Sequence, residues 1–409
     1  MPQFRFTERG FSTFYVQILA LVAAFSAFGI LFGTWQVLVS DLTSDLQLSP
    51  GQVGVSISWG LVGSVPAMFL ANRTIRRVGL RTVLLGSSLT ISLMLASLSV
   101  VQSYISLFMA LFLMFGMAGV YDMTINACAI TLESLSRKKF LIYLHAVFSG
   151  AAALSAVGMG LLLDAGISYK ALFSYGALVV GGLALTATIL MGHIDSSHIR
   201  ERKRLKVSGN AWTSTMLVIV TIAAIANLAQ GAVENWSAIY LRNSLTYTAL
   251  VGSSGVAIFH AAMLLGRVST GMAIRQLNVS KILMVSGGVT IMGITLTLLN
   301  ISSFLTLIGI LLMGVSLATV QPIAFTLAGA NAPNRASEAS TVVTTTSYIG
   351  LLIGPVLIGV VAELTSLRIA LSSVGVIGIL IIVLGQRLGS TKDVNQVSSE
   401  TSCCKPDTR

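Results

Sequence analysis

The chain has 409 residues, of which 55% are hydrophobic and 10% are charged, whereas a soluble globular protein carries about 25% charged residues. This composition excludes an ordinary soluble enzyme or binding module and indicates a polytopic membrane protein. The formal net charge of +11 would also suit nucleic-acid binding, but the charges lie between apolar stretches, which predicts an orienting role in the membrane and no nucleic-acid partner.

Twelve apolar stretches of about 20 residues follow one another, each long enough to cross a hydrocarbon core about 30 Å thick. Because a bilayer offers no water to satisfy backbone groups, and barrel strands are much shorter, we expect an all-α protein with twelve transmembrane helices. Of the 25 Lys and Arg residues, all but Lys170, Arg242, Arg267 and Arg368 then fall on the side of the N-terminus. The positive-inside rule therefore predicts a multi-pass protein of the cytoplasmic membrane with both termini in the cytoplasm.

The first span, about 14–39, brings Trp35 and Gln36 into the bilayer. The second and third spans are joined by the short basic connection 72–81, which must be cytoplasmic.

The fourth span, about 103–131, contains a carboxylate and an amide, Asp122 and Asn126. An ionisable side chain within a span costs roughly 2.5 to 3.5 kcal/mol on insertion scales, so it usually faces a protein interior or a watery path. The two residues are four positions apart and share one helix face with Gly119. We interpret this face as a site for substrate or protons; the alternative is a structural hydrogen bond to a neighbouring helix.

The fifth span opens with His145 and is rich in Gly, Ala and Ser, which let helix backbones approach closely. His145 is either a proton-shuttling or substrate-binding residue or a hydrogen-bonded packing residue, and the sequence leaves both open.

The longest interior connection, 193–211, separates two sets of six spans. The predicted organisation is an N-terminal six-helix bundle over 1–192, a basic cytoplasmic linker over 193–211, a C-terminal six-helix bundle over 212–388 and a disordered cytoplasmic tail over 389–409. The basic connection after the eighth span falls about 200 residues beyond the one after the second, which is typical of parallel-repeat transporters.

In the C-terminal half, the seventh span carries a polar stripe on one helix face, formed by Asn227, Gln230 and Glu234, and Trp236 follows it. Glu234 is the second acid buried in the membrane. The tenth span holds Gln321 beside a mid-membrane proline, which frees backbone carbonyls that can line a cavity.

Twelve spans in two halves, basic connections after the second and eighth spans and a charged central linker resemble the major facilitator superfamily over nearly the whole chain. Short stretches are similar to the branch that includes the rhizopine-transport membrane protein and related sugar-type permeases. These stretches are Phe32 to Trp35, Gly119 to Asn126 with Glu133, His145 to Gly150, Glu234 to Ser237, Gln321-Pro322 and Tyr348 through Pro355.

The resemblance implies two pseudo-symmetric six-helix bundles in which spans one, four, seven and ten line a central cavity. Buried polar residues occur in these same spans. We therefore predict a substrate site formed by Trp35, Gln36, Asp122, Asn126, His145, Asn227, Gln230, Glu234, Trp236 and Gln321. Trp35 and Trp236 are either aromatic walls that stack on a sugar ring or an apolar ligand or, equally, packing or interfacial residues.

The loop after the second span departs from the superfamily pattern, which has an Asp before its Arg and Gly; here the residues before Gly79 are Arg76, Arg77 and Val78. Glu338 is left as a partner for Arg73 or Arg76. The predicted cytoplasmic gate comprises Arg73, Arg76, Arg77, Arg81, Glu133, Arg267, Arg275 and Glu338.

The resemblance implies a secondary transporter that moves a small polar solute, such as a sugar, polyol or related metabolite, by alternating access. We expect Asp122 or Glu234 to bind a proton when buried, because removal from water disfavours a charged carboxylate. The hypothesis is proton-coupled uptake by a monomer with no metal and no cofactor. The alternatives are an efflux pump and a receptor without net flux; a membrane enzyme lacks any supporting motif.

Overall fold

A computed structural model describes residues 8–136, 138, 140–191, 213–274, 278–332 and 335–389. Within these ranges the side chains of residues 8–13, 72, 76, 271–273, 336–337 and 389 are not described. The predicted linker, 193–211, lies outside the described residues, as does the predicted tail, 389–409, apart from the backbone of its first residue.

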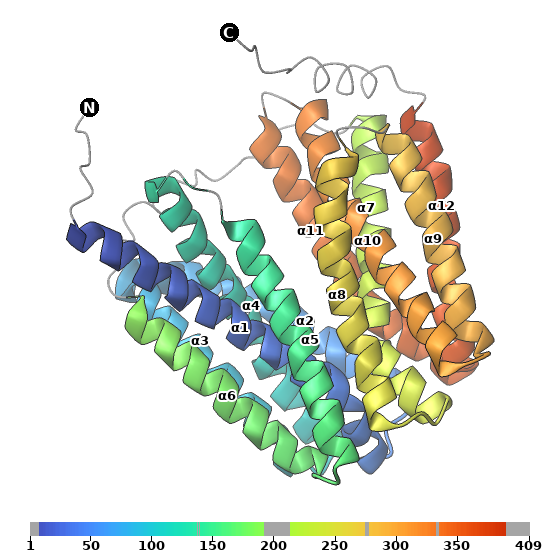
Figure 1. Cartoon of the computed structure of the whole chain (residues 1–409), viewed down its shortest axis with the longest axis horizontal. Helices are drawn as coiled ribbons and strands as arrows, with labels where there is room; N and C mark the ends of the chain where they lie inside the picture. Colours follow the sequence, from blue (N-terminus) through green and yellow to red (C-terminus); the bar gives the residue numbers. More distant parts are fainter. Residues whose placement is uncertain are drawn as a thin grey trace. The chain divides into compact units, whose positions relative to one another are not determined.

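Twelve helices of the described part are long and apolar enough to cross a membrane, which confirms the predicted number of spans (Figure 1). The described residues contain no strand. The helices are α1 (Glu8–Asp45), α2 (Pro50–Val78), α3 (Leu80–Ser97), α4 (Tyr104–Ser136), α5 (Leu141–Asp164), α6 (Tyr169–Leu190), α7 (Ser214–Ile239), α8 (Ala249–Ala273), α9 (Val279–Leu299), α10 (Ser303–Asn331), α11 (Ala336–Leu364) and α12 (Leu367–Gly389), with a 3-10 turn, η1 (Leu98–Val100), and a π-helical turn, η3 (Tyr240–Ser244).

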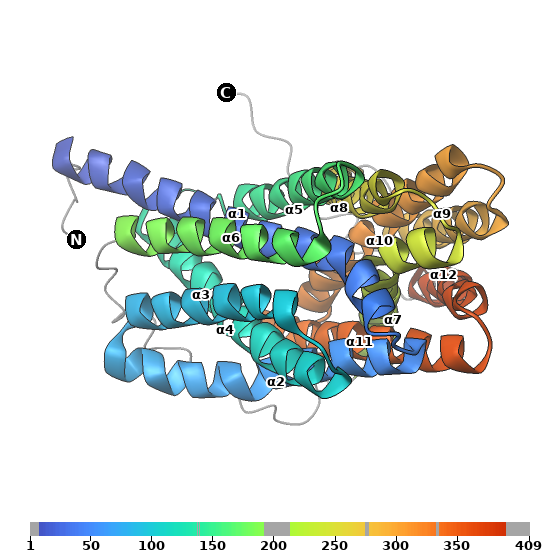
Figure 2. The same ribbon diagram turned by 90° about the horizontal axis from the view of Figure 1, so that it is seen from below.

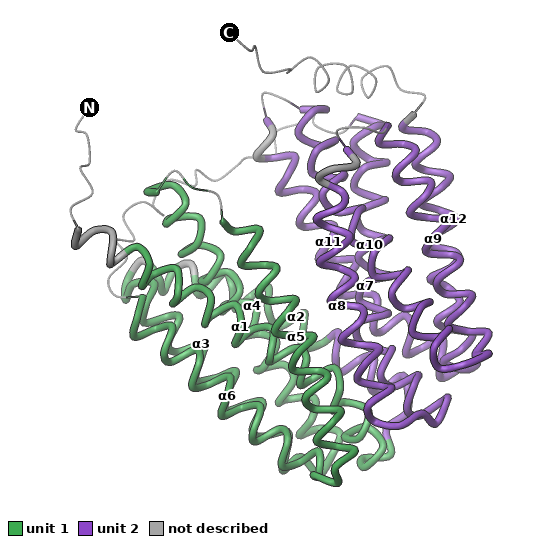
Figure 3. The backbone as a smooth tube through the Cα atoms, in the orientation of Figure 1, with its two compact units in different colours: residues 1–47, 59–203 green, residues 48–58, 204–409 purple. Residues whose placement is uncertain are grey.

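The helices form two compact units (Figure 3). Unit 1 comprises residues 1–47 and 59–203, and unit 2 comprises residues 48–58 and 204–409. The boundary therefore runs through α2, whose first turns group with the C-terminal helices.

Each unit has one helix that contacts most of the others. In unit 1, α1 packs against α4, α5 and α6, and α3 packs against α4 and α6 (Figure 2). Unit 2 repeats these contacts six helices later, because α7 packs against α10, α11 and α12, and α9 packs against α10 and α12. The recurrence shows that the two sets of six helices are built on one pattern.

Glycines allow the central helix of each unit to approach a neighbour closely. A Cβ atom added to Gly29 on α1 would lie 2.3 Å from the carbonyl oxygen of Phe148 on α5. A Cβ atom added to Gly350 on α11 would lie 2.0 Å from the carbonyl oxygen of Ala224 on α7. Both distances are far below van der Waals contact, so only glycine permits these backbones to pack as they do.

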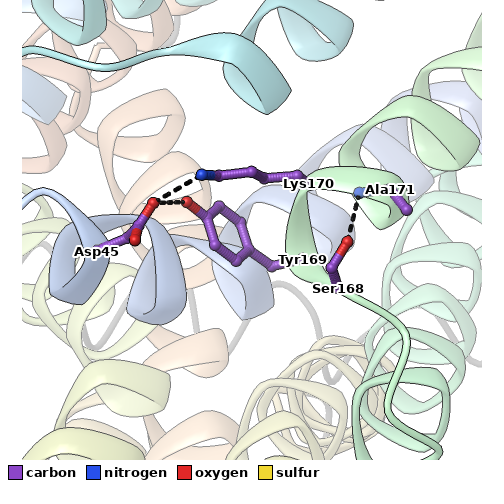
Figure 4. Close-up of polar contacts among 5 residues, drawn as sticks. All are labelled: Asp45, Ser168, Tyr169, Lys170 and Ala171. Carbon is purple, nitrogen blue, oxygen red and sulfur yellow. Dashed lines mark hydrogen bonds and ion pairs between the residues drawn. The ribbon is translucent and has the colours of Figure 1, made fainter.

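The end of α1 is fastened to the start of α6 by polar side chains (Figure 4). The Asp45 carboxylate accepts a hydrogen bond of 2.5 Å from the Tyr169 hydroxyl and pairs with the Lys170 ammonium at 3.0 Å. Ser168 caps α6, since its side-chain oxygen accepts a hydrogen bond from the backbone N–H of Ala171.

Within unit 2, hydrogen bonds connect the first turns of α2 to α11 near Pro355, which lies inside that helix. The Ser58 hydroxyl donates to the carbonyl oxygen of Leu352 at 2.7 Å and accepts from the N–H of Val356 at 3.1 Å. In an uninterrupted α-helix these two backbone groups would bond to one another. Ser58 therefore hydrogen-bonds two backbone groups of one helical turn beside Pro355, a residue that has no N–H group to donate.

A second contact fixes the start of α2. The Glu363 carboxylate of α11 accepts hydrogen bonds from the Ser49 hydroxyl and the Gly51 N–H, both at 2.7 Å. An acidic side chain at a helix N-terminus is favourable, because it satisfies N–H groups that have no partner in the helix.

Candidate functional site

In unit 1, the acid and the amide of α4 form one polar pair. The Asn126 Nδ2 group donates to the Asp122 Oδ1 atom at 2.8 Å and to the Asp122 backbone oxygen at 2.8 Å. Both side chains are partly exposed. The four-residue spacing thus produces a carboxylate whose orientation is held by an amide on the same helix face.

Aromatic rings from three helices gather beside this part of α4. Phe28 and Phe32 of α1 lie 5.0 Å apart between ring centroids, and Phe148 of α5 lies 5.5 Å from Phe28 and 6.1 Å from Phe32. Tyr121, the residue before Asp122, lies 5.7 Å from Phe28. Phe32 and Phe148 are partly exposed, so this cluster offers an apolar ring surface.

His145 is partly exposed on α5, and its ring meets Phe25 of α1 edge to face at 5.4 Å between ring centroids.

Trp35 and Gln36 are buried inside unit 1, with exposed fractions of 1% and 2%. Trp35 packs edge to face on Phe115 at 5.7 Å. For Trp35, burial favours the packing alternative over an aromatic wall that a solute contacts directly.

In unit 2, three helices share one amide oxygen. Gln321 on α10 accepts a hydrogen bond of 2.7 Å from Asn227 Nδ2 on α7 and one of 3.1 Å from the Ser347 hydroxyl on α11. The Asn227 amide also donates to the backbone oxygen of Ala223 at 2.9 Å. Gln321 of the tenth span and Asn227 of the polar stripe therefore belong to one hydrogen-bond network.

The other two residues of the stripe form a second pair. Gln230 Nε2 donates to the Glu234 carboxylate at 2.8 Å. Arg267 on α8 interacts electrostatically with Glu234 and with His260, which is 3% exposed on the same helix. An acid on α7 and a cation and an imidazole on α8 thus belong to one apolar bundle.

Trp236 follows the stripe but is 1% exposed, and within the described part its indole Nε1 has no hydrogen-bond partner. It is therefore an interior residue of unit 2, which again favours packing over a solute-facing wall.

The predicted gate residues are found in separate local contacts. Arg81 donates to the backbone oxygen of Thr188 at 3.1 Å, which supports the end of α6. Glu133 accepts from the N–H groups of Phe140 and Leu141 at 2.5 and 2.8 Å and so caps α5.

The remaining gate candidates come from three helices and one connection. Glu338 pairs with Arg335, three residues earlier. Arg73 and Arg77 are exposed at the end of α2, and Arg267 is partly exposed. The Arg76 side chain and the whole of Arg275 lie outside the described residues.

The structure contains residues beside the predicted substrate site that the sequence analysis did not include. Ser347 completes the Gln321 network, but in the sequence it is one of several Ser and Thr residues of its span and carries no distinguishing signal. Phe32 and Phe148 were not in the predicted set either, although both lie in stretches that resemble the family, because an apolar side chain in an apolar span does not by itself indicate a site. Among the described residues, no group of three or more His, Cys, Asp or Glu has the arrangement to hold a metal ion.

Comparison with known proteins identifies the class of the chain. Residues 19–355 match the model of the Major Facilitator Superfamily. An uncharacterized MFS-type transporter of Yersinia pestis is 28% identical over 87% of this chain and 91% of its own length. The membrane protein MosC of Rhizobium meliloti is 23% identical over 89% of this chain and 88% of its own length.

The fold has solved counterparts. The crystal structure of a mutant of the nucleoside transporter NupG matches 91% of this chain and 99% of its own, with a TM-score of 0.77 at 12% sequence identity. That likeness shows a shared fold. With the family model covering most of its length and a relative described as an MFS-type transporter, this chain belongs to the major facilitator superfamily and is a multi-pass membrane transporter, not an enzyme.

Proposed function

We propose that the protein takes up a small polar solute, such as a sugar, a polyol or a related metabolite, across the cytoplasmic membrane by proton-coupled alternating access. In this proposal the monomer is the working unit and both termini lie in the cytoplasm. The distribution of Lys and Arg supports that orientation, because short basic connections remain on the cytoplasmic side.

The observation that carries the proposal is the presence of hydrogen-bonded acids and amides within apolar spans of both units. Asp122 with Asn126, and Glu234 with Gln230, are carboxylate–amide pairs whose members are all partly exposed. Charged groups within a membrane are costly and are kept where they serve a ligand or an ion path. Amides and carboxylates are also the groups that bind solutes rich in hydroxyls.

The aromatic cluster of unit 1 supports a ring-shaped solute. Phe32 and Phe148 present partly exposed ring surface in the same unit as the Asp122 pair. Binding sites for small molecules combine such apolar walls with a few polar groups that fix orientation. A sugar-like ring has both an apolar face and hydroxyls, so it suits this combination.

Glu234 and Asp122 are the acids that we assign to proton coupling. A protonated Glu234 would lose its electrostatic attraction to Arg267 and would gain a hydrogen to donate. Protonation would thereby change the electrostatic interaction between α7 and α8, as a coupled carrier requires.

A thermal-shift screen of the purified transporter against sugars, polyols and amino-sugar derivatives identifies the solute, because a ligand that binds only the folded state raises the melting temperature. A solute at 100 times its Kd stabilises the folded state by about 2.7 kcal/mol. If only bulky hydrophobic drugs shift the melting temperature, the proposal of a polar solute is wrong.

Transport of that solute is then measured in proteoliposomes with an imposed proton gradient. Asp122→Asn and Glu234→Gln are expected to reduce proton-driven accumulation at least tenfold while solute exchange without a gradient continues. The control is Asp45→Asn, since this exposed acid pairs with Lys170 at the end of α1 and should leave accumulation unchanged. Normal accumulation in both test variants would remove these acids from the coupling role.

A further inference from the structure

Arg267 is a cation within an apolar span of unit 2. It lies on α8 in the span Ala249–Thr270, and its side chain is partly exposed. A charged side chain in a membrane span is costly, so it normally pairs with an opposite charge or serves a ligand or an ion path. The contacts of Arg267 therefore indicate which of these roles it has.

The guanidinium group of Arg267 makes no hydrogen bond and no salt bridge within the described part of the chain. Its interactions there are electrostatic, with Glu234 on α7 and His260 on α8. The Glu234 carboxylate instead accepts a hydrogen bond from Gln230 at 2.8 Å. The N–H donors of the guanidinium group consequently remain available to a ligand.

Glu234 is the one acid among the described residues of unit 2 that can balance this charge. The other two acids there, Glu338 and Glu363, are engaged elsewhere. Glu338 pairs with Arg335, and Glu363 accepts hydrogen bonds from the start of α2. A proton on Glu234 would leave the positive charge of Arg267 without a counter-charge in the described part of this unit.

The Arg267 side chain is on the side of α8 that carries polar residues. Leu265, two residues earlier, is 60% exposed, and at 3.6 residues per turn it lies about 200° away around the helix, so Arg267 is opposite an apolar surface suited to lipid. His260 lies seven residues before Arg267 and therefore shares its face. Helical side chains also tilt toward the helix N-terminus, which directs Arg267 toward the middle of the span and away from the nearby helix end at Ala273.

We propose that Arg267 binds a negatively charged group of the transported solute, which is then a sugar acid or a related hydroxy acid and not a neutral sugar. This inference rests on the proposed function, because it takes proton binding by Glu234 as given. A carboxylate of the solute accepts two parallel hydrogen bonds from the guanidinium fork, a geometry that arginine provides and lysine does not.

Charge balance links this solute to the proton. In the empty site the Glu234 carboxylate offsets the charge of Arg267. A proton bound alone leaves an excess positive charge, and an anion bound alone leaves an excess negative charge, each of which is costly away from water. Both together leave the pair balanced, so each ligand should raise the affinity for the other.

The first test compares acids with their neutral counterparts in thermal shifts of the purified wild-type transporter. The probes are D-glucuronate with D-glucose and D-gluconate with D-glucitol. At least one acid should bind about tenfold more tightly than its neutral counterpart. A neutral counterpart that binds as tightly as its acid overturns this inference and leaves the proposed function standing. A result in which neither acid raises the melting temperature also overturns the inference, while the wider screen of polyols and amino sugars still decides the proposed function.

The second test is Arg267→Gln, which removes the charge and keeps a polar side chain. The ratio of acid affinity to neutral affinity should fall about tenfold or more. Arg368→Gln is the matched control, because Arg368 is an exposed arginine of α12 in the same unit, and its removal should leave the ratio unchanged. If Arg267 serves only as a gate or packing residue, its substitution changes both affinities by the same factor, and that outcome overturns the inference.

Two further variants separate charge from geometry. Arg267→Lys keeps the charge without the fork, so its acid affinity should lie between those of the wild type and Arg267→Gln. Glu234→Gln resembles the protonated acid and should bind the sugar acid at least as tightly as the wild type does. Weaker binding in Glu234→Gln would contradict the charge balance. If Arg267→Gln fails to fold, the wild-type comparison of acids with neutral counterparts decides the inference alone.

Discussion

At the scale of single residues, Gln321 connects three helices, because its side-chain oxygen accepts hydrogen bonds from Asn227 on α7 and Ser347 on α11. Gln321→Met keeps the side-chain length and removes that oxygen. We expect the substitution to lower the unfolding free energy by about 1 to 3 kcal/mol, since the Ser347 hydroxyl and one Asn227 N–H lose their partner. Thermal unfolding of purified protein measures the change.

Gln102→Met is the control for this prediction. Gln102 is exposed in the connection before α4, so the same chemical change should alter stability by less than about 0.5 kcal/mol. Equal losses of unfolding free energy in Gln321→Met and Gln102→Met would mean that the hydrogen bonds of Gln321 do not stabilise the fold.

Residue contacts could be predicted only where they are local. The spacing of Asp122 and Asn126 predicts a shared helix face, and the structure contains the corresponding hydrogen bond. Glu133 illustrates the limit, because its hydrogen bonds to the N–H groups of Phe140 and Leu141 depend on the path of a connection that no pattern specifies. The link between Gln321 and Ser347 likewise depends on tertiary packing.

At the scale of helices, the contact between α1 and α5 depends on glycine. Gly29→Ala places a Cβ atom against the carbonyl oxygen of Phe148, so it should destabilise the protein by about 1 to 3 kcal/mol through overpacking. Gly158→Ala, on α5, is the control, because no atom lies within 4 Å of its added Cβ. That variant should gain up to about 1 kcal/mol from better helix propensity. Opposite shifts in melting temperature are expected, and shifts of the same sign would contradict the packing.

Helix number was predictable from hydropathy, but helix ends were not. The apolar stretch of the first span covers about 14–39, whereas α1 covers Glu8–Asp45, because backbone hydrogen bonding continues into polar residues beyond the hydrocarbon core. The π-helical turn at Tyr240–Ser244 has no sequence signature either.

At the scale of the whole molecule, the proposed orientation makes a prediction about labelling. In a background without Cys128, Cys403 and Cys404, Gln102→Cys should react with a membrane-impermeant maleimide in intact cells, because the connection between η1 and α4 is predicted to be external. Thr74→Cys, exposed near the end of α2, should react only after the membrane is permeabilised. The reverse pattern would invert the topology.

The repeat was visible in the sequence only as two basic connections about 200 residues apart. The structure shows it more strongly, because the helix contacts of α1 and α3 recur for α7 and α9. Sequence could not reveal this, since the contacts are made by small and apolar residues that differ between the halves. The close-packing glycines of the α1–α5 contact are on α1, whereas those of the α7–α11 contact are on both helices, at Gly231, Gly350 and Gly354.

The hydrogen bonds between Ser58 and α11 bear on where the sequences of two related transporters should be joined to make a chimera. A crossover placed in the central connection, 193–211, would combine α2 of one parent with α11 of another, so the serine that hydrogen-bonds α11 beside its proline would come from a different parent than α11 itself. The glycines that let the two helices touch there, Gly54 and Gly359, would be mismatched in the same way. Inheritance of residues 48–58 together with the C-terminal half keeps Ser58 and the α11 backbone that it bonds in one parent, so the longest connection between spans is not the best place to join two relatives.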